Sequence, residues 1–388
     1  MPALESLFIE KFRGLQDLQL NELGRINLMV GTNNSGKTSV LEALSIYSDP
    51  LNLREWWETS NSRIQEPRAT RSSVSDAIKW LFPHNHLDEM HDDSNLDVGC
   101  ISLSSQGTFP LVGLAASYEQ IEELRFSQND TKAEERAALT SGIELSVKII
   151  SQLSNEKDHT KFIANPPDLE DTVSKDRLKI QIWDGERVRF PRSSAHNFLV
   201  ETVTPVSHRL EDSQFRLLSE ARYQNFKSEV IDLLNSVDSG IEDIEILADL
   251  SSASALTHFS IYIQHATLGL APLDTFGDGI RRLLHIALKV VRVKGGVLLI
   301  DEIESTIHTE ALQSSYYWLA KWCEEMDVQL FATTHSLEAV DALLDVTNSQ
   351  DDLVLFRLEP SIGKTKVTRH DWSRLKILRE ELGQEVRW

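Results

Sequence analysis

The segment Gly31-Thr32-Asn33-Asn34-Ser35-Gly36-Lys37-Thr38 says more about the architecture of this chain than any other part of it. It has the pattern G-x-x-x-x-G-K-(S/T), and residues 26–30 before it predict a short buried strand. A helix is expected over residues 36–47. Glycine lets the backbone curl so that successive N–H groups point at phosphate oxygens, and the helix start adds a positive partial charge. The sequence therefore predicts a phosphate-binding loop (P-loop) for a nucleoside triphosphate.

Residues of this loop have separate expected roles. Lys37 is expected to reach the β and γ phosphates of ATP and so to contribute to catalysis, and the Thr38 hydroxyl is expected to bind Mg²⁺. The other residues predicted to contact the nucleotide here are Asn33, Asn34, Ser35, Gly36 and Ser39.

Composition and charge limit the class of protein. The chain has 388 residues, of which 41% are hydrophobic and 26% charged, as in a soluble globular protein of two or three lobes. Its net charge of -21 argues against a broad nucleic-acid-binding surface, which is normally basic. No apolar run is long enough to cross a membrane, no signal-peptide pattern is present, and Cys100 and Cys323 lack neighbours at metal-ligand spacing. We therefore expect a cytoplasmic protein without membrane contact, disulfide or zinc site.

Two acids follow a second buried strand. Residues 297–300 form an unbroken apolar run typical of a central parallel strand, and Asp301 and Glu302 come directly after it. Beside a P-loop, the first acid supports the Mg²⁺ shell and the second orients or deprotonates the attacking water. Two acids at a strand end are also a common feature of a helix N-terminus. With the P-loop upstream, we interpret Asp301 as a metal ligand and Glu302 as the catalytic base.

A histidine ends the next predicted strand, residues 328–332. The sequence there continues as Thr333-Thr334-His335-Ser336. A His at a strand tip beside Asp301 can hydrogen-bond a γ-phosphate and respond to its loss, whereas a lone His is more often structural. We therefore count His335 among the catalytic candidates.

A second glycine-rich segment, Phe276-Gly277-Asp278-Gly279, opens a helix with a regular apolar stripe. Free N–H groups at a helix start form an anion site, which makes Gly277 and Gly279 candidates for nucleotide binding. Since one P-loop already serves the chain's own nucleotide, we expect this end to meet the γ-phosphate bound by another subunit. The alternative is a simple glycine turn followed by a solvated basic face, made by Arg281, Arg282, His285 and Lys289.

The predicted elements divide the chain into an α/β core and inserted lobes. Residues 1–48 and 270–388 are expected to form the P-loop core around a mixed sheet. Residues 141–207 are expected to form an antiparallel β meander, and residues 208–269 a helical lobe that leads to the glycine segment.

Residues 49–140 are interpreted as a helical or irregular insertion. A short helix is expected near residues 117–125, within a run of strands from 97 to 205. Three arginines of the insertion either contact phosphate or nucleic acid or, more simply, lie in a solvated loop; they are Arg63, Arg68 and Arg71.

The order of these motifs resembles the ABC-type ATPase heads, and more narrowly the SMC, RecF and OLD lineage. Phe8-Ile9-Glu10-Lys11-Phe12-Arg13-Gly14-Leu15 is similar to the N-terminal hairpin of that lineage, in which an arginine matching Arg13 lies near the nucleotide. Residues 276–308 and 333–336 resemble the stand-alone OLD-like bacterial ATPases of anti-phage defence operons. The resemblance implies a P-loop NTPase with an ABC-ATPase-like head, with ATP and Mg²⁺ as cofactors.

Three departures from this lineage matter. The signature segment usually reads Leu-Ser-Gly-Gly, so the serine that touches the γ-phosphate is missing at Gly277. No glutamine-loop residue can be placed in residues 49–140. The residues after Ser336 are too few for the Toprim nuclease domain of OLD nucleases.

The resemblance implies an ATPase that dimerises or oligomerises around ATP and regulates a partner effector. That effector would be a separately encoded nuclease or toxin in prokaryotic anti-phage defence. The alternative is a RecF- or SMC-like DNA-binding ATPase of repair or genome maintenance, which rests on the insertion arginines and the basic helix face. The ATPase subunit of a transporter fits less well, because such subunits carry a clearer Leu-Ser-Gly-Gly signature.

Overall fold

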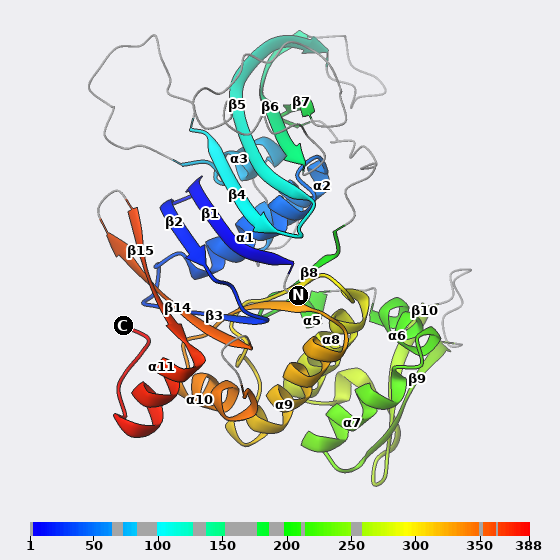
Figure 1. Ribbon diagram of the computed structural model, residues 1–388. Helices are drawn as coiled ribbons and strands as arrows, with labels where there is room; N and C mark the ends of the chain where they lie inside the picture. Colours follow the sequence, from blue (N-terminus) through cyan, green and yellow to red (C-terminus); the bar gives the residue numbers. More distant parts are fainter. Residues whose placement is uncertain are drawn as a thin grey trace.

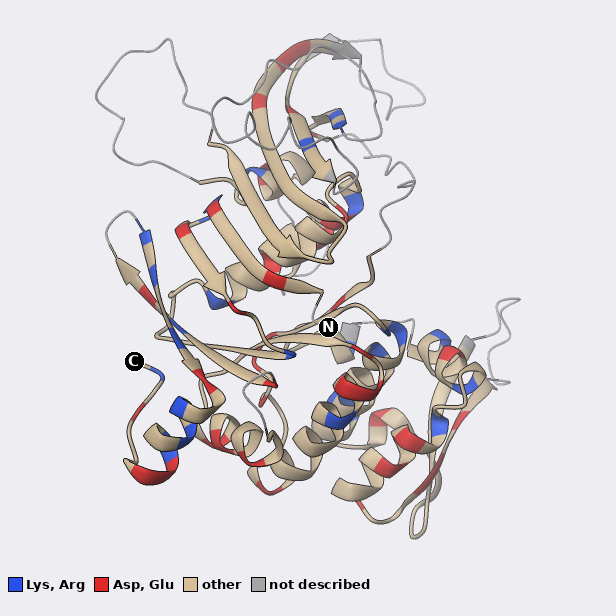
Figure 2. Ribbon diagram, in the orientation of Figure 1, with Lys and Arg blue, Asp and Glu red and all other residues tan. Residues whose placement is uncertain are grey.

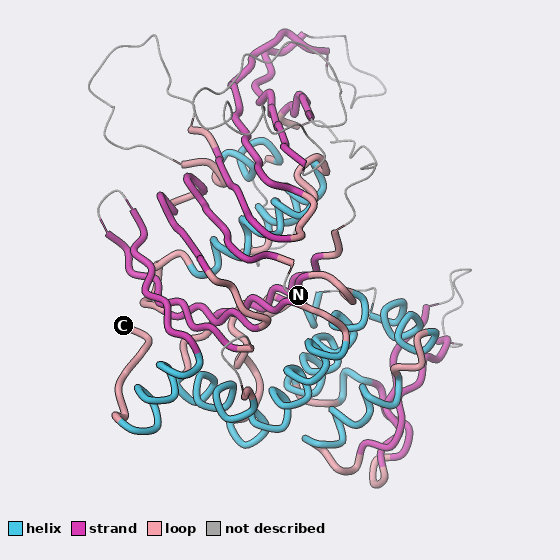
Figure 3. The backbone as a smooth tube through the Cα atoms, viewed as in Figure 1, coloured by secondary structure: helices cyan, strands magenta, loops and turns pink. Residues whose placement is uncertain are grey.

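The computed structural model describes residues 3–63, 73–83, 99–126, 137–151, 177–185, 198–210, 214–249, 258–348, 352–361 and 364–388 (Figure 1). Arg68 and Arg71 lie outside the described residues. Two large sheets stack with a helix between them, and further helices cover the outer face of one sheet (Figures 1 and 3).

A six-stranded mixed sheet carries the predicted motifs. Its order is β15-β14-β3-β13-β12-β8, with every pair from β14 to β8 parallel and β15 antiparallel to β14. Because parallel strands point the same way, the P-loop, Asp301 and His335 meet at one edge of the sheet. The strands are β3 (Ile26–Val30), β8 (Val200–Val203), β12 (Val297–Ile300), β13 (Gln329–Thr333), β14 (Leu353–Ser361) and β15 (Lys364–Asp371).

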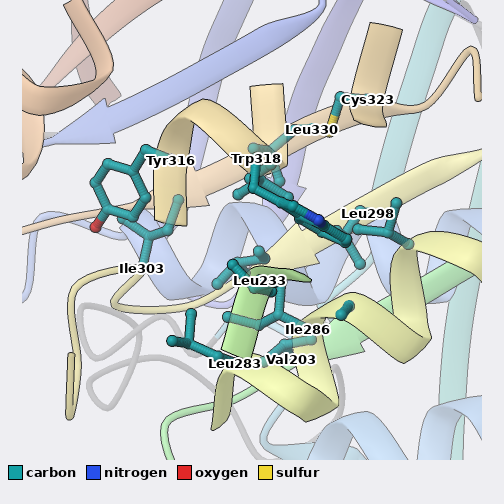
Figure 4. Packing of buried hydrophobic residues seen from close by; sticks show 14 of the residues in the cluster. Val203, Leu233, Leu283, Ile286, Leu298, Ile303, Tyr316, Trp318, Cys323 and Leu330 are labelled. Atoms are coloured by element: carbon teal, nitrogen blue, oxygen red, sulfur yellow. The ribbon is translucent and has the colours of Figure 1, made fainter. Parts of the chain in front are cut away.

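Both faces of this sheet are covered, which explains the unbroken apolar runs of its central strands. Leu298 and Ile300 of β12 join the core on one face, whereas Val297 and Leu299 join the core on the other. Figure 4 shows Leu298 close to Trp318 in the first of these cores. That face is covered by α8 (Asp278–Arg292), α9 (Thr309–Glu325) and α10 (Leu337–Val346).

Helix α1 (Lys37–Ser48) lies between the two sheets, and all its residues except Thr38 are buried. The helix predicted over 36–47 is thus confirmed, but it is covered on all sides rather than on one face. The second sheet, of order β2-β1-β4-β5-β6-β7, covers its other side. Its strands are β1 (Leu4–Phe12), β2 (Leu15–Asn21), β4 (Ile101–Gly107), β5 (Leu111–Phe126), β6 (Ala137–Ser151) and β7 (Arg177–Trp183).

The short helix predicted near residues 117–125 is wrong, since these residues belong to β5. The spacing of Glu119, Glu122 and Glu123 is compatible with a helix, but β5 pairs with β6 over its whole length, from Leu111 opposite Ser151 to Phe126 opposite Ala137. This long antiparallel ladder outweighs the local pattern. The range 49–140 therefore holds helices α2 (Leu53–Asn61) and α3 (Val74–Lys79), followed by strands from Ile101 onward.

Within the meander predicted over residues 141–207, β6 and β7 are antiparallel as expected and continue the ladder of β4 and β5, but the last strand, β8, lies in the other sheet. β8 pairs parallel with β12, with Val203 opposite Ile300. Its short sequence does not specify a partner, and its Val203 is buried in the core under α8. The domain boundaries themselves stay a prediction.

The helical lobe expected before the glycine segment is present. It comprises α5 (Ser207–Leu210), α6 (Gln214–Tyr223), α7 (Lys227–Val237) and a three-stranded sheet of β9 (Ile241–Asp249), β10 (His258–His265) and β11 (Gly269–Pro272). After β15 come α11 (Trp372–Lys376) and η3 (Ile377–Glu381). Among the described residues, none of the helices is long and apolar enough to span a membrane.

Candidate active site

The P-loop connects β3 to α1 through a strained turn. Asn34 and Gly36 have φ values of 63° and 93°, in the left-handed region. A Cβ at Gly36 would lie 2.4 Å from Leu15 Cδ2, so the β1–β2 hairpin requires glycine there. The side chains of Asn33 and Asn34 are exposed, and Ser35 is buried. The N–H groups of the first turn of α1 have no acceptor within the helix, which leaves them available to an anion.

Lys37 is held inside the curl of this loop. Its side-chain Nζ donates to the main-chain oxygens of Gly31 at 3.0 Å and Thr32 at 2.9 Å. Burial lowers the pKa of Lys37, and the nearby Asp301, Glu302 and Glu304 act in the opposite direction. The ammonium therefore lies beside the acids of β12, at the place where phosphate oxygens are expected.

Thr38 and Asp301 meet across the edge of the sheet. The Thr38 hydroxyl is 3.1 Å from both carboxylate oxygens of Asp301. The hydroxyl of Thr333, at the end of β13, donates to Asp301 Oδ1 at 2.6 Å. Hydroxyl and carboxylate oxygens are the donors that Mg²⁺ prefers, so Thr38 and Asp301 fit the ion. The sequence did not predict a role for Thr333; the only signal was a hydroxyl at the end of the strand next to Asp301.

Glu302 has an unusual backbone. Its φ is 49°, and its N–H donates to Thr333 Oγ1 at 2.8 Å. A glutamate in the left-handed region carries strain that the surrounding contacts must offset. Burial, followed by the charges of Asp301 and Glu304, raises the pKa of its carboxyl. A carboxylate with a raised pKa is a better proton acceptor, as general base catalysis requires.

His335 lies beside these acids at the end of β13. Its N–H donates to Glu304 Oε1 at 2.9 Å, and its main-chain oxygen accepts from Arg387 Nη1 at 2.6 Å. Its imidazole is near enough to Glu302 to oppose the rise in the pKa of that carboxyl. Neither Glu304 nor Arg387 was predicted to take part, since nothing in the sequence connects them with residue 335.

A cavity of about 740 Å³ opens beside Thr38 and Asp301. Its wall includes Thr204, in the loop that leaves β8, and Ser207, the first residue of α5. Polar residues that follow β8 therefore line the cavity together with Thr38 and Asp301.

Family comparison agrees with this geometry. Residues 26–341 match the family described as "AAA domain, putative AbiEii toxin, Type IV TA system". The chain belongs to this family. It is therefore an AAA-type P-loop ATPase, and nucleotide binding follows from membership.

Individual relatives of this AAA-family chain are distant. An uncharacterized protein of Methanocaldococcus jannaschii is 32% identical over 115 residues, which cover 29% of this chain and 98% of that protein. A Helicobacter pylori protein described as an ATP/GTP phosphatase is 20% identical over 359 residues, 90% of this chain and 89% of its own length. A solved SMC head domain bound to the C-terminal domain of ScpA, from Pyrococcus furiosus, has a TM-score of 0.47 at 9% identity, with 99% of this chain and 100% of that chain covered.

Arg13 of this AAA-family chain binds a helix rather than the P-loop itself. Its Nε is 2.8 Å from Glu42 Oε2 on α1. Arg63 binds the same carboxylate at 2.6 Å and also donates to Ser39 Oγ at 3.0 Å. Arg63 is thus tied to α1 rather than loose, its side chain is 46% exposed beside the cavity of Thr38 and Asp301, and a phosphate contact stays a prediction.

The basic face predicted for α8 is not solvated. Arg282 and His285 are 0% exposed and Lys289 is 4% exposed, although Figure 2 colours the Lys and Arg positions of this helix blue. Lys289 Nζ lies 2.7 Å from Glu201 Oε2, because β8 packs against this side of the helix. This correction removes the α8 face as support for DNA binding.

The glycine segment leads directly into α8. Gly277 is the N-cap of the helix and has an extended backbone, and no atom lies within 4 Å of the Cβ that it lacks. Asp278 pairs with Arg209 and lies 3.5 Å from His208 of the same lobe. The glycine segment is therefore held by residues of the helical lobe that precedes it.

Proposed function

We propose that this protein binds ATP with Mg²⁺ between the P-loop and the ends of β12 and β13, and hydrolyses it. The observation that carries the proposal is the convergence of Thr38 and Asp301, whose side-chain oxygens lie 3.1 Å apart although the residues are 263 positions apart in the sequence. The family supports the same nucleotide.

Each residue then has a defined task. Bound Mg²⁺ would neutralise phosphate charge, held by the Thr38 hydroxyl and the Asp301 carboxylate. Lys37 would turn its ammonium from the loop carbonyls to the β and γ phosphates, with Asn33, Asn34, Ser35 and Gly36 around them. Glu302 would accept a proton from the attacking water, and His335 would hydrogen-bond the γ-phosphate.

The test is a comparison of ATP hydrolysis by the wild-type protein and by Glu302→Gln. Loss of the base should lower kcat by about 10²- to 10⁴-fold while ATP still binds. Phosphate release measures the rate, and fluorescence of a labelled ATP analogue measures binding. If the wild-type protein releases phosphate no faster than Glu302→Gln, the proposed hydrolysis is wrong.

We also propose that the protein self-associates through its ATP sites and regulates a separately encoded effector in prokaryotic anti-phage defence. The start of α8 at Gly277 and Gly279 offers N–H groups to a phosphate held by a second copy. The family description refers to a toxin system, and the net charge of -21 suits protein rather than nucleic-acid partners. Light scattering of Glu302→Gln with and without ATP tests assembly, and an unchanged mass counts against it.

A further inference from the structure

Arg282 of α8 joins two segments that are far apart in the sequence. Its Nη1 donates to the main-chain oxygen of Thr204 at 2.9 Å. Its Nη2 donates to the main-chain oxygens of Asp301 at 2.9 Å and Glu302 at 2.7 Å. The side chain, 0% exposed, thus holds the loop after β8 and the loop after β12 in one place.

The partners of this buried guanidinium are unusual. Its hydrogen-bond acceptors are all neutral main-chain oxygens, and the carboxylates of Glu302, Asp301 and Glu304 compensate its charge only through space. Burial lowers the pKa of Arg282, but arginine remains charged in proteins. The planar fork of a guanidinium can donate to several carbonyls at fixed angles, whereas a lysine ammonium cannot reproduce that geometry.

The hydrogen bond from Arg282 helps to fix the backbone of Glu302 and therefore the position of the Glu302 side chain. The N–H of Glu302 is bound by Thr333 and its carbonyl by Arg282, so the residue is fixed on both sides in its left-handed conformation. Without these contacts the backbone would relax to the β or right-handed α region, which is lower in energy for a glutamate. That relaxation would move the carboxylate from its present place near Asp301, Glu304 and His335.

We propose that Arg282 is a positioning residue, which holds Glu302 in the strained conformation that aims its carboxylate at the attacking water. This inference rests on the proposed ATP hydrolysis. Arg282 does not itself touch the nucleotide, so its loss affects the chemical step and leaves nucleotide binding by Lys37 and Thr38 in place. Because Arg282 belongs to the helix that starts at Gly277, the orientation of α8 and the conformation of Glu302 are linked.

The test compares Arg282→Lys with Arg292→Lys. Arg292 lies on the same helix, but its Nε pairs with Glu201 at 2.8 Å, on a half-exposed side chain. Arg282→Lys should lower kcat by about ten- to a hundredfold, as expected for a small misplacement of a catalytic group, with the Kd of ATP within about twofold of wild type. Arg292→Lys should keep both values near wild type.

Hydrogen exchange gives a readout that does not depend on hydrolysis. In the nucleotide-free protein, Arg282→Lys should speed amide exchange in peptides covering residues 300–306 and 203–206, and leave peptides from α9 unchanged. If Arg282→Lys does not fold, the same measurements are made on Arg282→Gln, which avoids a buried ammonium. This exchange result stands even if the wild-type protein proves inactive, which would refute only the proposed hydrolysis.

Two results would overturn the proposal. One is a wild-type kcat in Arg282→Lys. The other is an equal loss of kcat, ATP affinity and thermal stability without a local change in exchange, which would mean that Arg282 only stabilises the fold.

Discussion

The P-loop and the start of α8 have similar sequences at a helix start, but their basic side chains lie in different surroundings. Each has glycines at a helix start, followed within three residues by a cation, Lys37 in one and Arg282 in the other. Lys37 is held by oxygens of its own loop and is buried next to Thr38. Arg282 is held by oxygens of two other strand ends and is fully buried.

This difference shows that glycine and a cation at a helix start do not by themselves specify phosphate binding. What differs is the oxygens that hold the cation: carbonyls of the P-loop itself for Lys37, and the ends of β8 and β12 for Arg282. We therefore expect the cations of the P-loop to affect ligand affinity and those of α8 to affect stability or geometry.

Lys289→Met should give the largest loss of stability. Loss of a buried ion-pair partner typically costs about 3–5 kcal/mol, and we expect about 3 kcal/mol because Arg292 still neutralises Glu201. Urea unfolding measures the free energy of unfolding. Lys289 lines the same cavity as Thr38 and Asp301, but Glu201 holds its ammonium at 2.7 Å, so the Kd of ATP should stay near wild type. A large rise in Kd with unchanged stability would reverse the assignment.

Lys37→Ala should weaken ATP binding rather than lower stability. Removal of the ammonium loses charge-assisted hydrogen bonds to phosphate, so the Kd of ATP should rise about ten- to a hundredfold, which corresponds to about 1.4–2.8 kcal/mol. Titration calorimetry measures it. Lys289→Met is the matched control, and an unchanged Kd in Lys37→Ala would refute the role of the P-loop lysine.

Gly36→Ala and Gly277→Ala should differ in their effect on the free energy of unfolding. At Gly36 a methyl group meets Leu15 at 2.4 Å on a backbone with φ of 93°, so we expect a loss of about 2 kcal/mol in the free energy of unfolding. Gly277 has open space around it and should tolerate alanine within about 0.5 kcal/mol. Thermal unfolding of the two variants gives the comparison, and equal losses would contradict it.

Thr333→Val should lower the free energy of unfolding by about 1 kcal/mol, less than Lys289→Met or Gly36→Ala, since it removes the hydroxyl that contacts Asp301 and the N–H of Glu302. Its kcat should fall more than its stability implies, because both acids lose an orienting contact. Thr334→Val, whose hydroxyl contacts Ser336 instead, is the control. Equal rates in the two variants would show that Thr333 does not orient the acids.

Much of the core could be predicted because its signals are local. The P-loop pattern, the apolar strand before Asp301 and the strand before Thr333 each specify their own structure, and their parallel order brings their ends together. The contacts of Arg282 could not be predicted, since its helical periodicity places it opposite the apolar stripe, where a cation is normally solvated. It is buried only because β8 adds to the sheet beside β12 and covers that side of α8.

The same reason explains one wrong prediction and two contacts that were not predicted. The acids of residues 117–125 have helical spacing, and only the partner strand β6 makes them a strand. Arg13 and Arg63 share Glu42, which no spacing links to either residue. In each case the structure depends on contacts between residues far apart in the sequence, and local sequence patterns do not indicate such contacts.

The position of β3 has a consequence for the synthesis of the chain. The neighbours of this early strand are β13 and β14, both of which are translated close to the other end. Until they leave the ribosome, Ile26–Val30 is an apolar strand with two open edges, the kind of segment that associates with other nascent chains. Fragments that stop before residue 353 should therefore aggregate or be held by chaperones, and ATP can stabilise only the finished chain.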